Sequence, residues 1–445
     1  MISQYLRNRI FYSVKMDAWQ HTISKSHVTV DPIHLKLNRH LASDLHPTDK
    51  QRNAFNSLFI QAFNQVKSMH PKILSRKQAS WKVTLIGEAA DDYGGPFRES
   101  LSNMCQELIA FDPPVLDLFI PTPNKVSGQG DNRDKFVPNP KSTSDQHLKW
   151  YEFIGMLMGI GILTKNVLPF DYPSLIWKVL VNEKIGWNDL RAFDEEIYNA
   201  MKSILKLEDV DPNTDPELFA IMEESFSQTY YGKTFTAIGS DGKEIELVPG
   251  GSHIDLTYRN RKQYASLLYD FRLTREFVAQ MNAIRKGLFN MITNRYFSLF
   301  SWNEIERNIC GIPDVDVEKL KQHTIYEGYT AQSKEVKYFW EILQSFSPEQ
   351  RSLFLKFVWG RGRMPYNESE AFTNPMKIQK LDRPNPDNVL PLSHTCFFSI
   401  EIPPYSTKEI MKDKLLYAIV NCKAIDIDFT TTAIEAQNAI SGPRY

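Results

Sequence analysis

The chain has 445 residues, 42% of them hydrophobic, which is enough for two or three compact units with cores of their own. Its 52 basic and 53 acidic residues nearly cancel, which argues against nucleic acid as an obligate partner. The longest apolar run, residues 153–163, is roughly half of what a membrane-spanning helix needs, and charges interrupt residues 1–9, so we expect neither a membrane span nor a secretory signal.

The four cysteines are Cys105, Cys310, Cys396 and Cys422. They form no Cys-x-x-Cys pair, and no histidine lies at zinc-ligand spacing from them. We therefore expect neither a disulfide framework nor a structural metal. A cytoplasmic location, or a nuclear one, follows as the expected compartment.

An amphipathic helix is predicted at about residues 48–70. The sequence from Thr48 to Gln51 has the spacing of a capping box, and Pro71 would end the helix. Apolar residues recur between them at helical intervals: Phe55, Leu58, Phe59, Ala62, Phe63 and Val66. Residues 1–40 show no clear apolar period, so residues 1–76 are interpreted as an N-terminal extension. Its helix either docks on the domain that follows or acts as a regulatory clamp.

A strand and two helices are predicted next. Residues 81–86 alternate between apolar and polar side chains, as in a strand, and a glycine pair then turns the backbone into a helix. Cys105 lies on the apolar stripe of that helix, so it is interpreted as a core residue. In residues 153–163, Gly155 and Gly159 lie one helical turn apart, and we expect another helix to approach closely there.

Residues 190–270 combine helical patterns with a hairpin. The Gly-Ser-Asp-Gly sequence at residues 239–242 is typical of a hairpin turn. Apolar residues form one face of a helix at residues 194–207, and others open a long helix near residue 264. These residues are Ile197, Met201, Ile204 and Leu205 in the first helix, and Tyr264, Leu267, Leu268 and Phe271 in the second.

The helical pattern breaks at residues 310–314, Cys-Gly-Ile-Pro-Asp. Beyond this break, apolar repeats predict two helices between residues 339 and 358 and a last helix at residues 408–422. The segment 366–389 is rich in Pro, Asn and Asp and is predicted to be a loop.

Cys396 lies in a distinctive setting, between a polar Ser-His-Thr run and two phenylalanines. This setting suits a half-exposed thiolate, apolar on one side and hydrogen-bonded on the other. If residues 393–397 are extended, alternation places His394 and Cys396 on the same face, so that a proton carrier lies beside the thiol. The alternative is a small buried hydrophobe at the end of a strand, as is common for free cysteine.

The sequence around Cys396 also forms a motif. Leu-Pro-x-Ser-x-Thr-Cys-Phe at residues 390–397, followed by Ile-Pro-x-Tyr at 402–405, resembles the active-site signature of the HECT-type ubiquitin ligases. Other family-like motifs occur in family order between residues 81 and 428: residues 87–99, 153–159, 260–264, 338–341 and 355–361. The Trp-Gly-Arg and Gly-Gly-Pro-Phe sequences within them look closest to the large HERC-like branch.

The resemblance implies an α+β fold of two lobes. Residues 77–312 correspond to the larger, mostly helical N-terminal lobe, in which about 190–270 form the subdomain that binds the conjugating enzyme. Residues 313–445 correspond to a smaller α/β C-terminal lobe with the catalytic cysteine. Gly311, Ile312 and Pro313 correspond to the flexible hinge.

The resemblance also implies the chemistry. Cys396 would be the nucleophile that carries ubiquitin as a glycyl thioester and passes it to a substrate lysine. His394, Glu88 and Asp171 would accept the proton of that lysine, although a structural hydrogen bond is an equal alternative for the two carboxylates. No metal or organic cofactor is implied.

Ubiquitin, a ubiquitin-conjugating enzyme and protein substrates are the implied partners. The positions that match the family's docking surface are Ile197, Met201, Tyr264 and Leu268, for which an ordinary core face is the alternative. The C-terminal tail departs from the family pattern, because the position of the family's last phenylalanine falls near Ile425 and the chain continues past Phe429.

Two other classes of protein are alternatives to a ubiquitin ligase. A papain-like thiol hydrolase would need a histidine far downstream of its cysteine, but all ten histidines precede Cys396. A catalytically silent interaction module that retains the HECT fold is the second alternative, since the cysteine would persist there through packing.

Overall fold

The computed structural model describes residues 7–43, 54–87, 95–109, 114–360, 362–365 and 375–421. The chain forms two compact units. The first is drawn from residues 1–20, 108–156 and 171–305, and the second from residues 21–107, 157–170 and 306–445. Both contain helices and small sheets, so the α+β prediction is confirmed.

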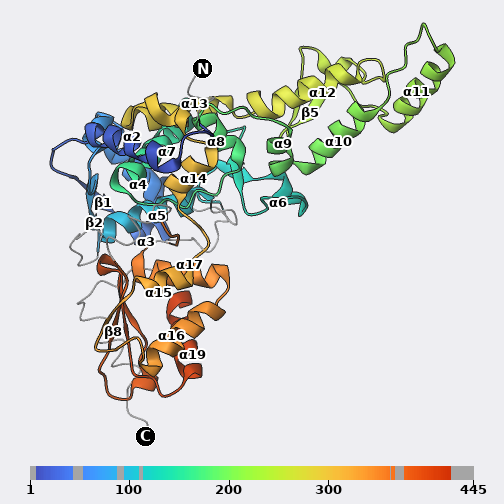
Figure 1. Cartoon of the computed structure of the whole chain (residues 1–445). Coiled ribbons are helices and arrows are strands. Elements are labelled where there is room, and N and C mark those ends of the chain that lie inside the picture. The colour runs from blue at the N-terminus through green and yellow to red at the C-terminus, as the bar shows by residue number, and fades with distance from the viewer. Residues whose placement is uncertain are drawn as a thin grey trace. The chain divides into compact units, whose positions relative to one another are not determined.

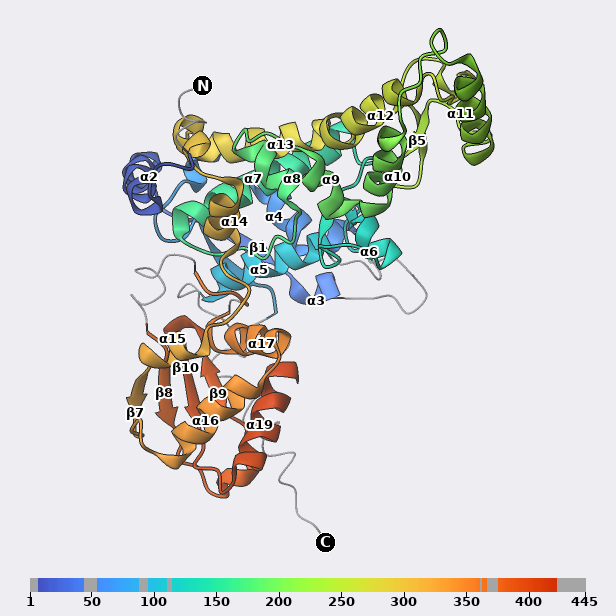
Figure 2. The same cartoon turned by 45° about the vertical axis from the view of Figure 1, so that its right-hand side comes forward.

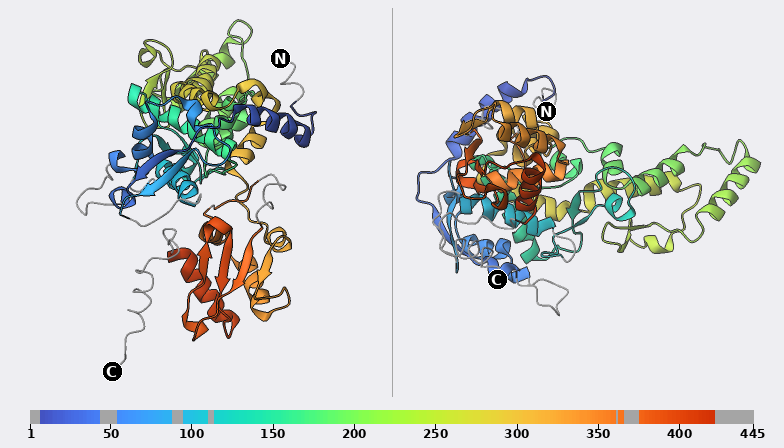
Figure 3. Two further views of the ribbon diagram at one scale, coloured as in Figure 1. Left: turned by 90° about the vertical axis from the view of Figure 1, so that its left-hand side faces the viewer. Right: turned by 90° about the horizontal axis from the view of Figure 1, so that it is seen from below.

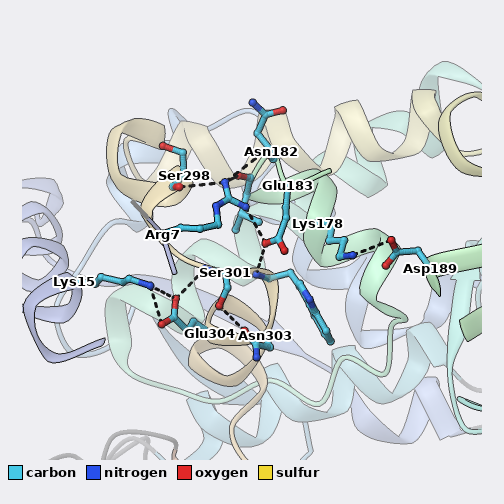
Figure 4. A network of polar contacts seen from close by, with 12 residues as sticks. Arg7, Lys15, Lys178, Asn182, Glu183, Asp189, Ser298, Ser301, Asn303 and Glu304 are labelled. Carbon is cyan, nitrogen blue, oxygen red and sulfur yellow. Dashed lines mark hydrogen bonds and ion pairs between the residues drawn. The ribbon is translucent and has the colours of Figure 1, made fainter. Parts of the chain in front are cut away.

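The N-terminal segment contains a helix, α2 (Tyr12–Ser26), although the sequence shows no clear apolar period there. In the first unit this segment is held by ion pairs and by one tryptophan. Lys15 bonds both carboxylate oxygens of Glu304 at 2.9 and 2.8 Å, and Arg7 donates to Glu183 at 2.8 Å (Figure 4). The ring of Trp19 packs edge-on against Phe297 and Phe300. Because ion pairs hold this segment in place, its sequence has no clear period of hydrophobic residues.

Two helices approach each other closely in the first unit: α13 (Val278–Met291) and the part of α7 (Asp145–Thr164) up to residue 156, where the first unit's share of α7 ends. A methyl group added to Gly155 would overlap the carbonyl oxygen of Ile284, and one added to Gly287 would overlap that of Glu152. The close helix approach predicted at Gly155 is therefore confirmed, and Gly287 provides the matching gap. In the part of the chain that is described, no helix is long and apolar enough to cross a membrane.

Smaller elements complete this part of the first unit. The antiparallel pair of strands β3 and β4 joins residues 119–121 to 136–138. This part of the unit also contains the helices α6 (Pro123–Ser127), α8 (Ser174–Leu180) and α9 (Trp187–Phe193), and α9 contacts both of the others.

A separate group of elements lies at one end of the first unit, in green and yellow in Figures 1 and 2. It contains α10 (Glu195–Lys206), α11 (Pro216–Thr229), the β5–β6 hairpin and α12 (Arg261–Asp270). The hairpin pairs Thr236–Ile238 with Glu244–Glu246, and Gly242 in its turn has a φ of 76°. The hairpin predicted at residues 239–242 is thereby confirmed.

A buried ion cluster lies where α12 gives way to α13, in a π-helical turn at Phe271–Arg275. Arg272 donates to both carboxylate oxygens of Glu276, at 2.7 and 2.6 Å, and also to Asp194. Burial raises the pKa of the Glu276 carboxyl, while the Arg272 guanidinium opposes that shift. We call Arg272, Glu276 and Asp194 the buried cluster.

The second unit begins with a pair of parallel strands, β1 (Ile33–Leu37) and β2 (Trp81–Leu85). Beside them lie α4 (Leu58–Val66) and α5 (Gly95–Ile109), and the Glu107 carboxylate accepts the first two amide hydrogens of α4. The strand predicted at residues 81–86 and the core position of Cys105 are confirmed.

The helix predicted at about 48–70 is shorter than expected. It begins at Leu58 with Ser57 as its cap, and Phe55 lies outside it with 69% of its surface exposed. Thr48 to Gln51 lie outside the described residues. The unit continues through residue 76, where the N-terminal extension was predicted to end.

The rest of the second unit contains a four-stranded sheet in the order β7-β8-β10-β9, shown in Figures 2 and 3. The strands are β7 (Ile325–Glu327), β8 (Lys377–Lys380), β9 (Leu392–His394) and β10 (Ser399–Ile402). The helices that share its hydrophobic core are α15 (Val317–Gln322), α16 (Lys334–Ser345), α17 (Pro348–Trp359) and α19 (Lys408–Asn421).

These elements confirm α16, α17 and α19 but overturn part of the loop predicted at residues 366–389. β8 is an inner strand with parallel partners on both sides. Its sequence, Lys-Ile-Gln-Lys, looks polar because only one face is covered: Ile378 is in the core, whereas Lys377 and Gln379 lie on the opposite face. Cys422 lies outside the described residues.

Candidate active site

Cys396 lies in the tight connection between β9 and β10, which pair as antiparallel strands. His394 is opposite Ser399, and Leu392 is opposite Glu401. Between the strands, residues 395–397 form one 3-10 turn, and Phe398 ends it with a φ of 49°. The backbone of Cys396 thus occupies the middle of a turn that joins two strands.

The condition that residues 393–397 are extended is met only as far as His394. The chain has to reverse direction between His394 and Ser399 to pair the two strands, and an extended segment cannot do so. The alternation argument that placed His394 and Cys396 on one face therefore fails. The side chain of Cys396 is outside the described part of the structure, so a half-exposed thiol stays a prediction.

The turn is anchored by an aromatic stack. Phe398 is buried and its ring lies on that of Trp359, the last residue of α17, with 4.1 Å between centroids and 6° between planes. A positive φ is uncommon for a bulky residue and is held only where the surroundings enforce it. Phe397, by contrast, has 64% of its surface exposed. The turn around Cys396 is therefore fixed on one side and open on the other.

His394 has a carboxylate partner in the same hairpin. Its Nε2 atom lies 2.7 Å from Oε1 of Glu401. A carboxylate only accepts hydrogen bonds, so Nε2 carries the proton in this pair. The predicted role of His394 as a proton acceptor stays a prediction.

The pair lies on the polar face of the sheet. This face also presents Lys377, Gln379 and Glu327, which contact one another: Gln379 donates to Glu327 at 2.6 Å, and Lys377 lies 3.3 Å from it. The opposite face packs Ile378 and Ile400 into the core. Charged chemistry is therefore possible on the first face and excluded on the second.

The two predicted carboxylate bases are less well defined. Glu88 lies outside the described residues. Asp171 belongs to the first unit, where it is half-buried and its backbone carbonyl accepts the amide hydrogen of Phe136 at 2.8 Å. Their roles in proton transfer stay predictions.

The four predicted docking residues divide into two kinds. Met201 and Leu268 have 0% and 3% of their surface exposed, because α10 and α12 pack on each other. Ile197 and Tyr264 are half-buried. The Tyr264 hydroxyl donates to the carbonyl of Thr236 at 3.1 Å, and burial raises the pKa of this phenol. Met201 and Leu268 thus support the subdomain from inside, in line with the alternative of an ordinary core face. Docking at Ile197 and Tyr264 stays a prediction.

The exposed apolar side chains of that subdomain were not predicted as docking residues. They are Leu205, Leu218, Ile221, Tyr231, Ile238 and Ile254. Leu218 and Ile221 are one turn apart on α11, a spacing that marks a common helical face. That spacing was a usable signal, but helical periodicity alone does not tell an exposed apolar face from a buried one.

The predicted hinge residues follow α14 (Trp302–Cys310). Gly311 has a φ of 70°, and a methyl group on it would overlap the carbonyl oxygen of Met364. Ile312 and Met364 exchange two backbone hydrogen bonds, at 2.7 and 3.1 Å. In this conformation the segment is held, and a hinge motion would have to break that bridge.

The fold and the hairpin cysteine agree with one class of protein. The family model for the HECT domain, described as a ubiquitin-transferase, matches residues 102–428, which is more than half of the chain. The chain therefore belongs to the HECT-domain family.

Several curated ubiquitin ligases are similar to this chain. The E3 ubiquitin-protein ligase HERC2 of Mus musculus is 35% identical over 373 residues, 84% of this chain and 7% of that protein. NEDD4 of Homo sapiens is 30% identical over 348 residues, 77% of this chain and 24% of that protein. The E3 ubiquitin-protein ligase pub3 of Schizosaccharomyces pombe is 29% identical over 344 residues, which are 76% of this chain and 40% of that protein. The chain thus spans less than half the length of these relatives.

Proposed function

We propose that this chain is a HECT-type ubiquitin ligase that accepts ubiquitin as a thioester on Cys396 and transfers it to substrate lysines. The family match across residues 102–428 carries the proposal. The setting of Cys396 supports it, because the residue lies in a turn fixed by Phe398 and Trp359 and two residues after a carboxylate-paired histidine. The relatives carry the name of ubiquitin ligase, and nothing in the chain favours a silent module.

The two steps make different demands. Moving ubiquitin from one cysteine to another exchanges like bonds, so it needs mainly a thiolate and a docking geometry. A substrate lysine, with a pKa of about 10.4, must lose a proton before its amine attacks the thioester. We assign this proton to His394, with Glu88 and Asp171 as carboxylates that would assist once the N-terminal lobe is close.

Ubiquitin, a conjugating enzyme and protein substrates are the proposed partners. The conjugating enzyme would dock on the subdomain of α10, α11 and α12. Ile197 and Tyr264 are the predicted positions with surface left to contact it, and Leu218 and Ile221 add exposed apolar area. Gly311, Ile312 and Pro313 would let the C-terminal lobe move between this enzyme and the substrate.

A reducing compartment, cytosol or nucleus, fits this chemistry. Among the described residues, Cys105 and Cys310 are buried and form no disulfide. A transferable thioester also needs a free thiol at position 396, and such thiols persist where disulfides are reduced. Fractionation of cells that produce the full protein tests the location.

The decisive experiment is an adduct assay. The chain is mixed with activating enzyme, conjugating enzyme, ubiquitin and ATP, and the products are separated on gels with and without reductant. We expect a reductant-sensitive ubiquitin adduct in the wild type, and a reductant-resistant oxyester in Cys396→Ser. Absence of any adduct, with several conjugating enzymes, would favour the silent interaction module.

A further inference from the structure

We propose that the turn of the β5–β6 hairpin, residues 239–242, fixes the direction of the conjugating-enzyme-binding subdomain within the first unit. Ser240 and Asp241 are then positioning residues for the charging of Cys396. This inference rests on the proposed function, because it concerns the step in which a docked conjugating enzyme transfers ubiquitin. The turn lies outside the family-like motifs of the sequence.

The chain crosses between the rest of the first unit and the subdomain at two places. It enters through Asp194, which ends α9 and caps α10 by accepting the amide hydrogen of Ile197 at 3.0 Å. It leaves through the π-helical turn at Phe271–Arg275, between α12 and α13. Arg272 in that turn pairs with Asp194, so the buried cluster ties the two crossings together.

The hairpin turn adds a third tie at this junction. The amide of Ser240 donates to Oε1 of Glu276 at 2.5 Å, and the Ser240 hydroxyl accepts from Nη1 of Arg272 at 2.9 Å. Lys141, in the segment between β4 and α7, donates to the carbonyl of Asp241 at 3.2 Å, and its ammonium lies 3.8 Å from the Asp241 carboxylate. The tip of the hairpin thus contacts both the buried cluster and a loop outside the subdomain.

These contacts fix a direction more strictly than the ring contacts near them. Trp187 of α9 packs on Tyr198 and Tyr269 of the subdomain, with 6.2 and 4.5 Å between centroids. Aromatic pairs are favourable over centroid distances of about 4.5–7 Å, so they tolerate a small tilt. Hydrogen bonds weaken steeply when their angle changes. The turn therefore limits a tilt that the rings would allow.

The composition of the buried cluster agrees with a task in orientation. Two carboxylates face one guanidinium, and burial raises the pKa of the Glu276 carboxyl. Such groups are costly to bury, and packed hydrophobic side chains would join two helices at least as stably. What charge-assisted hydrogen bonds add is a defined geometry. The π-helical turn supports this interpretation, because such turns occur frequently at functional sites.

The direction of the subdomain matters because the conjugating enzyme is bound to it. In the charging step, the Cys396 thiolate forms a bond to the carbonyl carbon of the enzyme's thioester, the old C–S bond breaks, and the enzyme's sulfur leaves as a thiolate. A misplacement of about 1 Å can cost roughly a hundredfold in the rate of such a step. Loss of the turn contacts should therefore slow charging by bound enzyme without changing its affinity.

The test is a single-turnover charging assay at increasing concentrations of ubiquitin-loaded conjugating enzyme. It gives a maximal rate of charging and a half-saturating concentration. The variant combines Ser240→Ala with Lys141→Ala, which removes two contacts of the turn and leaves the charges of the buried cluster in place. Melting temperatures are compared with that of the wild type.

We expect the maximal rate to fall about tenfold in this double variant, with the half-saturating concentration within about twofold of the wild type. Ser240→Thr with Lys141→Arg keeps the hydroxyl and the cation and should restore most of the rate. Ser252→Ala is the matched control, because its hydroxyl donates to Glu246 at 2.5 Å inside the subdomain. Both quantities should stay at their wild-type values in this control.

Three outcomes would overturn the assignment. They are an unchanged maximal rate in the double variant, an equal loss in Ser252→Ala, and a higher half-saturating concentration at an unchanged maximal rate, which would place the turn in the docking surface. Discharge of charged Cys396 to lysine, which needs no conjugating enzyme, should stay at the wild-type rate, and a loss there would also count against the proposal. Failure of the wild type to form an adduct would refute the proposed function instead.

A distance measurement tests the orientation without any transfer of ubiquitin. Donor and acceptor dyes are attached to noncanonical amino acids at Val126 in α6 and Ile221 in α11, whose surfaces are 75% and 62% exposed. The double variant should broaden the distribution of energy-transfer efficiencies, and Ser252→Ala should not. An unchanged distribution in the double variant would overturn the proposal even if charging were slower. Because this readout involves no ubiquitin, its failure is distinguishable from failure of the proposed function.

Discussion

Two ionic groups of this protein contrast in their exposure. In the buried cluster of the first unit, the side chains of Arg272, Glu276 and Asp194 have 1%, 0% and 6% of their surface exposed. In the second unit, the pair of His394 and Glu401 keeps 22% and 27%. Both groups pair carboxylates with a nitrogen-containing side chain, but only the second group is exposed to water.

The difference separates stability from reactivity. A buried charge that loses its partner is left without solvent, so each member of the buried cluster is indispensable to the others. In a half-exposed pair, water can solvate either group when it loses its partner, and the pair can pass a proton to a reactant. Changes in the first group should therefore lower the free energy of unfolding, and changes in the second should lower a rate.

The largest expected effect is on the reactive side, at Cys396. Cys396→Ala should abolish both the ubiquitin adduct and the product, because the variant has no nucleophile, while the melting temperature stays near that of the wild type. Gel assays and thermal denaturation measure the two. A reductant-sensitive adduct that persists in Cys396→Ala would refute the assignment of the nucleophile.

The next effect is on the stability side, at Arg272. Arg272→Ala should lower the free energy of unfolding by about 3–5 kcal/mol, because two carboxylates stay buried without their cation. Arg191→Ala is the matched control: Arg191 also pairs with a glutamate four residues on, but 54% of its side chain is exposed, so we expect a change of about 0–1 kcal/mol. Denaturant titration distinguishes the two, and equal effects would contradict the difference expected between buried and exposed ion pairs.

Substitution of Gly311 tests whether stability and ubiquitin transfer depend on the conformation of the hinge segment. Gly311→Ala should destabilise by about 1–3 kcal/mol through its positive φ, and more through the overlap with the Met364 carbonyl. Gly232→Ala has the same φ of 70° with open space around it, so it shows the backbone contribution alone. Charging and discharge of Cys396 are measured for both. Normal rates in Gly311→Ala would place the hinge elsewhere.

The smallest effect is expected at Tyr264. Truncated anchors of transient interfaces often cost more than 1–2 kcal/mol, so Tyr264→Ala should slow charging of Cys396 roughly tenfold at subsaturating conjugating enzyme. Tyr417→Ala, on the exposed face of α19, is the control. Because the Tyr264 hydroxyl also donates to the carbonyl of Thr236, the melting temperature of Tyr264→Ala has to be compared with that of the wild type. Unchanged charging would leave Tyr264 as a packing residue.

Local patterns were sufficient where one face of an element is apolar and the other polar. The stripes of α5, α16, α17 and α19 and the alternation of β2 were all predicted correctly. The same patterns failed for α2, which is anchored by Lys15 and preceded by the ion-paired Arg7, and for β8, whose Ile378 alone marks the core. Where long-range ion pairs or a single buried side chain hold an element, no window of sequence contains the signal.

The sequence by itself determined the class of the protein and indicated Cys396 as the candidate nucleophile, because the motif around Cys396 and the family-like segments are contiguous. Tertiary structure alone decided which side chains of the β9–β10 hairpin meet. Glu401 meets His394 because a turn of four residues, 395–398, sets the register of β9 and β10. Met201 and Leu268, which share a helical pattern with exposed residues, are buried because α10 and α12 pack together. Pairing and burial depend on contacts between distant segments, and periodicity along the chain does not encode them.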